Sequence, residues 1–246
     1  MSPGSARAVR SVVVLSGAGL SADSGLPTFR GAGGLWEGQR VEDVATPEAW
    51  ARDPARVWRF YQLRRAALAS IEPNAAHHAL VELEGRLAAA GASFTLVTQN
   101  VDDLHERAGA RALLHMHGEL GVLRCERCDG RVRDRERVDP AVFLACAGCG
   151  HTRLRPDVVW FGERPHHMEA IARALERCTH FLAVGTSGVV YPAAGFLEAA
   201  RAGGARTLVQ ALERPENLRS ADAFLPGRAA EAVPAFVRSF CEEWGL

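Results

Sequence analysis

Short apolar runs alternate with longer amphipathic segments along most of the chain. The runs are rich in Val and Leu, and they lie at residues 11–15, 94–98, 112–116, 157–160, 181–184 and 207–209. Continuous apolar runs of this length are typical of central strands in a parallel sheet that is covered on both faces. Helical spacing is found between them, at residues 75–90, 166–177, 193–202 and 233–243. The alternation predicts an α/β fold with a doubly wound parallel sheet.

Two segments depart from this alternation. Residues 35–72 carry aromatic side chains at helical spacing and no strand-like run, and residues 120–155 hold four cysteines with several glycines and arginines. We expect both to be insertions that form a smaller lobe. The Rossmann-like domain then consists of residues 1–34, 73–119 and 156–246, and the groove between the lobes is the expected binding site.

The composition is that of an ordinary globular protein. The chain has 246 residues, 48% of them hydrophobic, and its 29 basic and 29 acidic residues give a formal net charge of zero. This balance argues against a nucleic-acid partner, because nucleic-acid-binding proteins carry a basic excess that displaces phosphate counterions. All the basic residues are arginines, which we attribute to GC-rich coding rather than to function.

The sequence also bears on compartment. No apolar stretch approaches the roughly 20 residues that a membrane span needs. The apolar run at residues 12–15 is too short for a signal peptide. We therefore expect a cytoplasmic protein without a membrane partner, and the sequence does not indicate its oligomeric state.

Four cysteines have the spacing of a metal site. Cys125-x2-Cys128 is followed by Cys146-x2-Cys149, which in a reducing compartment is the pattern of a zinc ribbon. Four thiolates complete a tetrahedron and leave no position for water, so the predicted zinc ion is structural rather than hydrolytic. The alternative is a set of buried cysteines without a metal.

A glycine-rich loop follows the first apolar run. Gly17, Gly19 and Ala22 fit the G-x-G-x-x-A fingerprint of dinucleotide-binding proteins, in which glycines bring the backbone close to a pyrophosphate. The alternative is a glycine-rich turn without a ligand. A dehydrogenase would continue with a second strand that ends in an acidic residue, whereas this chain continues with SGLPTFRGAGGLW. That departure argues against hydride transfer.

Longer motifs resemble those of the sirtuins, which are NAD-dependent protein lysine deacylases. They are GAGLSADSGLPTFRG (17–31), TQNVDDLHERAG (98–109), HGEL (117–120), RPDVVWFGE (155–163) and GTSGVVYPAA (185–194), in the order of the family. With the cysteine pairs, the resemblance covers the chain from Val12 onward. It implies that an acyl-lysine side chain and NAD react to give free lysine, 2′-O-acyl-ADP-ribose and nicotinamide.

The resemblance also assigns roles to residues. His117 would be the general base that takes a proton from the ribose hydroxyls, and Asn100 the second catalytic residue. Asp102 would hold the nicotinamide carboxamide, although an Asp here is also expected to cap the next helix. The implied NAD contacts are Gly17, Ala18, Gly19, Ser21, Ala22, Thr28, Phe29, Arg30, Trp36, Gln99, Asn100, Val101, Asp102, Gly185, Thr186, Ser187 and Ala229.

One segment indicates the acyl preference. Tyr61 and Arg64 lie i and i+3 on a predicted helix and therefore point the same way. The segment FYQLRR resembles sirtuins that remove succinyl and malonyl groups, in which a Tyr and an Arg bind the acyl carboxylate. Ala32 agrees with a widened acyl channel. The alternative is that Arg64 is a solvent-exposed helix residue like other arginines of this chain.

Two positions depart from the family pattern, and other functions stay open. Val209-Gln210-Ala211 stands where sirtuins commonly have Glu-x-Asn, and His115-Met116 stands where many have Glu and an aliphatic residue. His115 shares a strand face with His117, and we expect it at most to tune the pKa of His117. The competing functions are a mono-ADP-ribosyltransferase and a non-enzymatic NAD-sensing scaffold protein; a dehydrogenase is the most distant.

Overall fold

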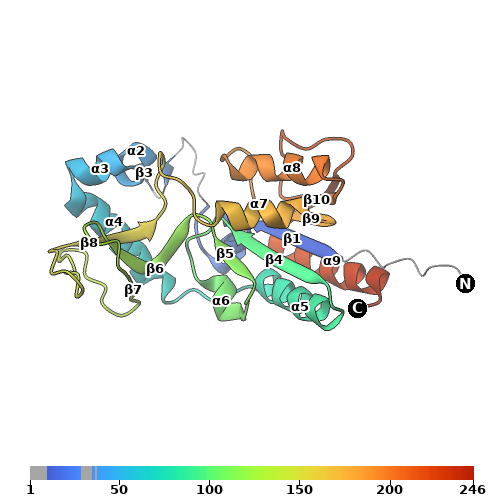
Figure 1. Cartoon of the computed structure of the whole chain (residues 1–246), viewed down its shortest axis with the longest axis horizontal. Helices are drawn as coiled ribbons and strands as arrows, with labels where there is room; N and C mark the ends of the chain where they lie inside the picture. The colour runs from blue at the N-terminus through green and yellow to red at the C-terminus, as the bar shows by residue number, and fades with distance from the viewer. Residues whose placement is uncertain (1–9, 29–34, 37) are drawn as a thin grey trace, which may run out of the picture.

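The computed structural model describes residues 10–28, 35, 36 and 38–246, and its chain forms two lobes (Figure 1). The larger lobe contains a six-stranded parallel sheet. In sheet order its strands are β11 (Ala223–Pro226), β10 (Arg206–Ala211), β9 (His180–Val184), β1 (Ser11–Ser16), β4 (Ser93–Thr98) and β5 (Leu113–His115). The strand order reverses between β1 and β9, and open α/β sheets bind their ligands at such a reversal.

Alternate residues of β1 contact different helical layers. Val12 and Val14 belong to the apolar cluster under α5 (Ala75–Ala89) and α9 (Ala229–Trp244). Val13 and Leu15 belong to the cluster under α7 (Met168–Glu176) and α8 (Phe196–Ala202) on the other face. Helices therefore cover both faces, which confirms the predicted doubly wound sheet and explains its continuous apolar strands.

The smaller lobe has its own sheet and core. Strand β6 (Gly118–Cys125) pairs antiparallel with β7 (Arg131–Arg133) and β8 (Leu154–Val158). Three helices pack on this sheet, namely α2 (Val41–Val44), α3 (Pro47–Arg52) and α4 (Pro54–Leu68). The buried side chains of Trp50, Trp58, Tyr61, Leu123 and Trp160 fill the space between them.

The shorter elements connect these layers. They are α1 (Ala18–Ser21), the 3-10 turns Ala22–Ser24 and Ala193–Gly195, β2 (Leu35–Trp36), β3 (Gln39–Arg40) and α6 (Leu104–Ala108). The helix predicted at residues 193–202 therefore begins with a 3-10 turn, and its α-helical part starts at Phe196.

The structure corrects one predicted strand and adds another. The run at 157–160 is not a strand of the parallel sheet, since Asp157 and Val158 end β8, antiparallel to β6 in the smaller lobe. An apolar run indicates burial but not which sheet buries it. The sheet edge β11 was not predicted, because its short AFLP sequence ends in a proline and has little strand character.

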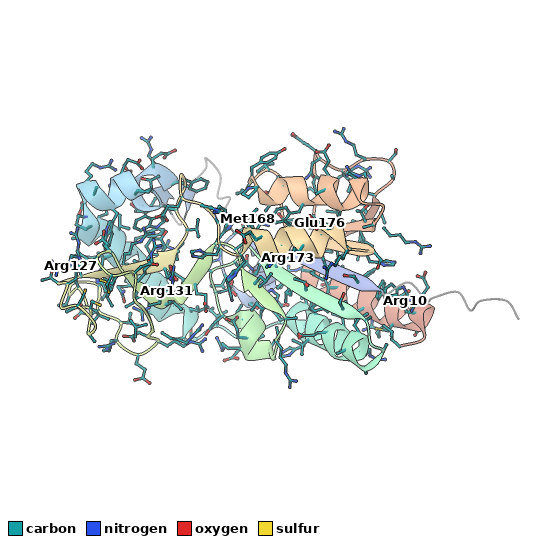
Figure 2. The ribbon with its side chains drawn as sticks, viewed as in Figure 1. Arg10, Arg127, Arg131, Met168, Arg173 and Glu176 are labelled. Atoms are coloured by element: carbon teal, nitrogen blue, oxygen red, sulfur yellow. The ribbon has the colours of Figure 1, made fainter. Side chains whose placement is uncertain are left out.

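Charged side chains project from both lobes (Figure 2). Arg127 and Arg131 lie on the smaller lobe, and Arg173 and Glu176 lie on the exposed side of α7. Within the described residues, every helix is too short or too polar to cross a lipid bilayer.

Candidate active site

A cavity of about 610 Å³ lies at the carboxyl ends of β1, β4 and β9 and is lined by residues from both lobes. Most of the predicted site residues line it. They are Gly17, Ala18, Gly19, Ser21, Thr28, Tyr61, Arg64, Gln99, Asn100, Val101, Asp102, His117, Gly185, Thr186 and Ser187.

The other predicted residues are placed differently. Ala22 and Ala229 are not among the residues that line the cavity, and Ala229 is the buried first residue of α9. Phe29, Arg30 and Ala32 lie outside the described residues, and so does the side chain of Trp36.

The glycines after β1 and β9 allow two loops to touch. The N–H of Gly17 donates to the carbonyl of Val184 at 2.9 Å, and that of Gly19 donates to the carbonyl of Gly185 at 2.8 Å. A Cβ at Gly17 or Gly19 would lie 2.8 Å from the Gly185 carbonyl oxygen, and Gly185 itself has a φ of +60°. These glycines are therefore needed first for the close packing of the two loops. The N–H groups of Gly17 and Gly19 are used inside the protein, so a ligand can bind only to other backbone groups of the loops.

Asn100 and Asp102 share a buried hydrogen-bond network with Ser21. The Asn100 amide nitrogen donates to the Gly17 carbonyl at 3.2 Å and to the Ser21 hydroxyl at 3.0 Å. That hydroxyl donates to Asp102 Oδ2 at 3.1 Å. The second carboxylate oxygen accepts the N–H of Leu104, the first residue of α6, at 3.2 Å. Asp102 therefore accepts a hydrogen bond from the first turn of α6 and also lines the cavity.

Burial sets the ionisation of Asp102. It raises the pKa of this carboxyl to about 6, although the hydrogen bonds from Leu104 and Ser21 favour the ionised form. The carboxylate is consequently charged near neutral pH and is already partly protonated one pH unit below.

The hydrogen bond of His117 determines its tautomer. Its Nδ1 lies 3.1 Å from the carbonyl oxygen of Gln99, and a carbonyl only accepts, so Nδ1 carries the proton. Nε2 then holds the lone pair when the ring is neutral. Burial lowers the pKa of His117, and the nearby His166 lowers it further, against the Gln99 hydrogen bond. The arrangement is that of a neutral imidazole able to accept a proton.

His117 stands where the chain passes from one sheet to the other. It lies between β5 of the parallel sheet and β6 of the smaller lobe. Gly118 has a φ of +79°, and a Cβ there would overlap the carbonyl of Asp157. The N–H of Val159 donates to the carbonyl of His117 at 2.9 Å. The glycine after the histidine is thus required where β6 begins to pair with β8.

Tyr61 and Arg64 line the same cavity from α4. Tyr61 is fully buried, and its hydroxyl accepts the indole N–H of Trp160 at 3.0 Å. Burial raises the pKa of Tyr61, so the phenol is neutral. The Arg64 guanidinium donates to the Phe60 carbonyl at 2.7 Å and stacks 3.2 Å from the centre of the Phe60 ring. Arg64 is only 8% exposed, so its interpretation as a solvent-exposed helix residue is wrong.

Sequence reasoning assigned no role to the residues behind this wall. Arg155 forms a two-pronged ion pair with Glu163, at 2.7 and 2.9 Å, and its guanidinium stacks 3.3 Å from the centre of the Trp160 ring. Trp160 and Glu163 line the cavity. The signal was present in the motif RPDVVWFGE, but only the fold shows that its side chains brace Tyr61.

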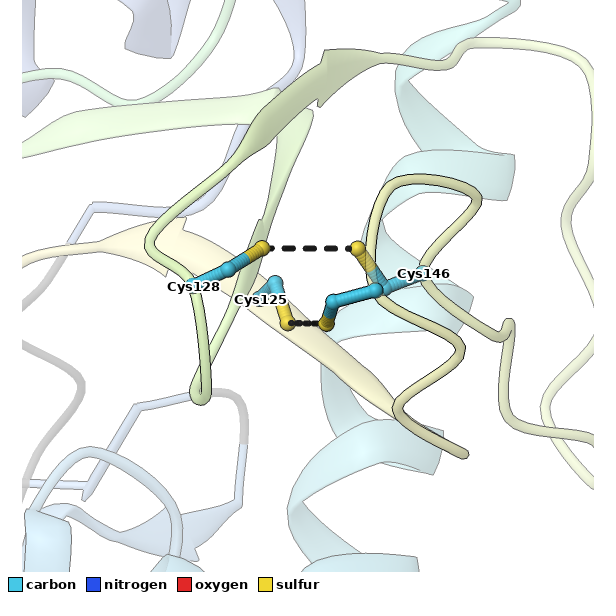
Figure 3. A group of neighbouring side chains, drawn as sticks. Cys125, Cys128 and Cys146 are labelled. Carbon is cyan, nitrogen blue, oxygen red and sulfur yellow. Dashed lines mark hydrogen bonds between the residues drawn. The ribbon is translucent and has the colours of Figure 1, made fainter.

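The four cysteines of the predicted zinc ribbon come together in the smaller lobe (Figure 3). Their sulfur atoms lie within 4.8 Å of one another, with 3.6 Å between Cys125 and Cys149 and 3.7 Å between Cys128 and Cys146. A tetrahedron with Zn–S bonds of about 2.3 Å has edges of about 3.8 Å, so these positions fit one zinc ion.

Both cysteine pairs have the same backbone turn. The residue after each second cysteine, Asp129 or Gly150, has a positive φ and donates its N–H to the carbonyl of the first cysteine of the pair. These turns direct both sulfur atoms of a pair to one point. None of the described residues that line the cavity is a cysteine, so the cysteine cluster lies apart from the cavity.

Residues 209–211, where the sequence departs from the sirtuin pattern, form hydrogen bonds within the protein. The Gln210 side-chain amide donates to the carbonyl of Gly227 at 2.7 Å, and the N–H of Gly227 donates to the carbonyl of Ala211 at 3.2 Å. These bonds connect the end of β10 to the loop that precedes α9.

Comparisons with known proteins agree with this geometry. A family model described as "Sir2 family" matches residues 17–192. The NAD-dependent protein deacylase of Bdellovibrio bacteriovorus is 49% identical over 239 residues, which cover 96% of this chain and 99% of that protein. A solved Sir2 homologue mutant in complex with ADP-ribose has a TM-score of 0.85 and 39% identity, over 96% of this chain and 94% of that one. A Sir2 homologue–NAD complex has a TM-score of 0.82 and 37% identity, over 95% and 90%.

Proposed function

The chain belongs to the Sir2 family, the sirtuins, and from that premise we propose which groups this NAD-dependent protein deacylase removes. They are succinyl and malonyl groups on protein lysines, and also acetyl groups. The products are free lysine, 2′-O-acyl-ADP-ribose and nicotinamide. A zinc ion held by the four cysteines would support the fold and would take no part in the reaction.

The contact between His117 Nδ1 and the Gln99 carbonyl, which leaves the lone pair on Nε2, is the observation that carries the deacylase chemistry. NAD supplies the ribose that accepts the acyl group and the nicotinamide that leaves. With Nδ1–H committed to Gln99, the Nε2 lone pair of His117 is the base that takes the ribose hydroxyl proton. Asn100 and Asp102, fixed by Ser21, are the residues we assign to the nicotinamide ribose and carboxamide.

The pocket at α4 supports the preference for acidic acyl groups. Its wall is otherwise largely apolar and includes Ala45, Ala67, Leu68, Ile71 and Val158. A guanidinium fork in such surroundings matches a carboxylate, which pairs with two of its N–H groups in one plane. The Tyr61 hydroxyl, held by Trp160, adds a second polar group at the same end. Acetyl-lysine fits the same space but has no carboxylate for Arg64.

The partners follow from the same proposal. Acylated lysines of proteins are the substrates, with the peptide bound as an extended strand between the lobes. The cysteines are arranged for a metal ion rather than for disulfides, which supports a reducing, cytoplasmic location.

The test is an NAD-dependent turnover assay on matched acetyl-lysine and succinyl-lysine peptides, read by mass spectrometry. We expect faster succinyl removal and release of O-succinyl-ADP-ribose. Removal of acetyl alone would retain the deacylase and contradict the acidic pocket. Transfer of ADP-ribose to protein without acyl release would instead support a mono-ADP-ribosyltransferase.

A further inference from the structure

His115, the last residue of β5, contacts an acceptor with each of its ring nitrogens. Nδ1 lies 3.2 Å from the carbonyl oxygen of Asn100, and Nε2 lies 3.0 Å from Glu106 Oε1 on α6. The side chain is 10% exposed, so water does not replace these partners. A carbonyl and an ionised carboxylate only accept hydrogen bonds, so both nitrogens must donate. The geometry therefore requires an imidazolium.

The charges around His115 agree with this state. Glu106 on α6, Glu119 on β6 and Asp102 after β4 are the acids that face it, and His105 and His167 are the other titratable bases. Arg133 on β7 pairs with Glu119. Burial alone would lower the pKa of His115, but the hydrogen bond and charge of Glu106, with Glu119 and the Asn100 carbonyl, raise it.

His115 contacts the backbone of Asn100, a residue that lines the cavity. Two consecutive carbonyl groups, those of Gln99 and Asn100, accept hydrogen bonds from His117 and His115 respectively. The side chain of Asn100 is held separately, by the Gly17 carbonyl and Ser21. The Asn100 N–H donates to the Thr98 hydroxyl at 3.1 Å, and His115 holds the Asn100 carbonyl.

We propose that His115 is a positioning residue that, paired with Glu106 as an imidazolium, holds the Asn100 peptide group in place for NAD binding. When His115 loses its proton, the carboxylate of Glu106 retains the N–H at Nε2, and Nδ1 becomes a lone pair facing the Asn100 carbonyl. The contact is then repulsive, and the peptide group is released. Binding of NAD consequently weakens as the pH rises through the titration of His115. This inference rests on the proposed role of Asn100.

The variant Glu106→Gln tests whether the hydrogen bond from His115 to Asn100 depends on the positive charge of His115. The Gln amide can donate to Nε2, so a neutral His115 keeps Nδ1–H on the Asn100 carbonyl at any pH. We expect the wild-type NAD affinity, measured by calorimetry, to fall on the alkaline side, and we expect Glu106→Gln to abolish this fall. An unchanged alkaline fall in Glu106→Gln would overturn the proposal.

His115→Gln tests the positioning directly. It should lower kcat/KM for NAD about tenfold, the loss of one hydrogen bond to a charged group, while the control His78→Gln on the exposed side of α5 leaves it unchanged. Nitrogen NMR of the His115 ring in the full chain should show both nitrogens protonated at pH 6, because the contacts of His115 raise its pKa above 6.5 whereas burial alone would lower it. A single protonated nitrogen at that pH overturns the proposal even if His115→Gln fails to fold. Since NMR and calorimetry need no turnover, an inactive enzyme would contradict the proposed function and not this inference.

Discussion

His117 Nδ1 and the carbonyl oxygen of Gln99 are 3.1 Å apart, and this contact leaves Nε2 as the basic atom of the ring. The Gln99 side chain extends in another direction, where its amide donates to the Thr186 hydroxyl at 3.0 Å. One residue thus orients the histidine and also joins the loops after β4 and β9. The position of His117 is therefore set by the parallel sheet.

Replacing His117 by Ala should separate chemistry from binding. A general base typically contributes between about 10² and 10⁴ in rate, so we expect deacylation to fall by at least about a hundredfold. Affinity for NAD should change by only a few fold, because the Asn100 and Asp102 network does not include His117. Single-turnover assays and calorimetry measure the two quantities. Full turnover by the variant would exclude His117 as the base.

The acid side of the pH profile should report the low pKa of His117. Burial, with His166, lowers that pKa below 6.5, and the base acts only when neutral. We therefore expect kcat/KM for the acyl peptide at saturating NAD to stay constant down to a pH below 6.5 and then to fall tenfold per unit. A break above pH 6.5 would show that a different group limits the rate.

Tyr61→Phe combined with Arg64→Met should change the acyl preference. Loss of a charged hydrogen bond to a carboxylate costs about 1.5–3 kcal/mol, so kcat/KM for succinyl-lysine should fall about tenfold to a hundredfold. The acetyl-lysine value should change by only a few fold. Arg59→Met, an exposed position on the same helix, is the matched control and should affect neither. Equal loss on both peptides would contradict the acidic pocket.

His77 should make the fold sensitive to acid. Burial, with the neighbouring His78, lowers the pKa of His77 from 6.5 to about 4. The unfolded chain therefore binds a proton below pH 6.5 that the folded chain does not bind. The free energy of unfolding then falls by about 1.4 kcal/mol per pH unit as the pH drops from 6.5 towards 4.

Urea denaturation at pH 6.5, 5.5 and 4.5 measures this effect. His77→Gln should show a shallower loss of stability with falling pH, even if its stability at pH 6.5 is lower. His105, also buried with a lowered pKa, accounts for part of the remaining slope. The same slope in the wild type and in His77→Gln would contradict the assignment.

Loss of the zinc ion should destabilise the smaller lobe. Cys128→Ser removes one of four ligands whose sulfur atoms already fit a tetrahedron, and metal binding is coupled to folding at such sites. We expect a lower melting temperature and less than one zinc per chain by metal analysis. Cys178→Ser, a buried cysteine outside the cluster, should retain its zinc. A Cys128→Ser protein as stable as wild type but inactive would contradict the structural role.

The strands of the parallel sheet were predictable where burial on both faces forces a continuous apolar run. β1, β4, β9 and β10 were found in this way, whereas the edge strand β11 has too little apolar sequence to signal itself. The run at 157–160 was assigned to the wrong sheet, because the pairing of β8 with β6 depends on a glycine at residue 118 that lets the two strands approach closely.

Local spacing also indicated the cysteine cluster and the glycine-rich loop after β1. The resemblance to the sirtuins indicated the loops after β4 and β9, which lie at the same edge of the sheet. Contacts between distant side chains could not be predicted. The hydrogen bond from Trp160 to Tyr61 and the two acceptors of His115 join residues far apart in the sequence or on different elements. A sequence shows which chemistry is available at each position, but only the packing shows which groups meet.

The chain has arginines but no lysine. Its carboxylates therefore pair with guanidinium groups, as Glu163 does with Arg155 and Asp222 with Arg201. The amine of lysine attacks the acyl carbon of reagents and metabolites that acylate proteins, and each adduct removes a positive charge. A guanidinium keeps its proton at physiological pH and is a poor nucleophile. Within its 246 residues this deacylase therefore presents no side chain of the kind it acts on, and its ion pairs persist where acyl donors are abundant.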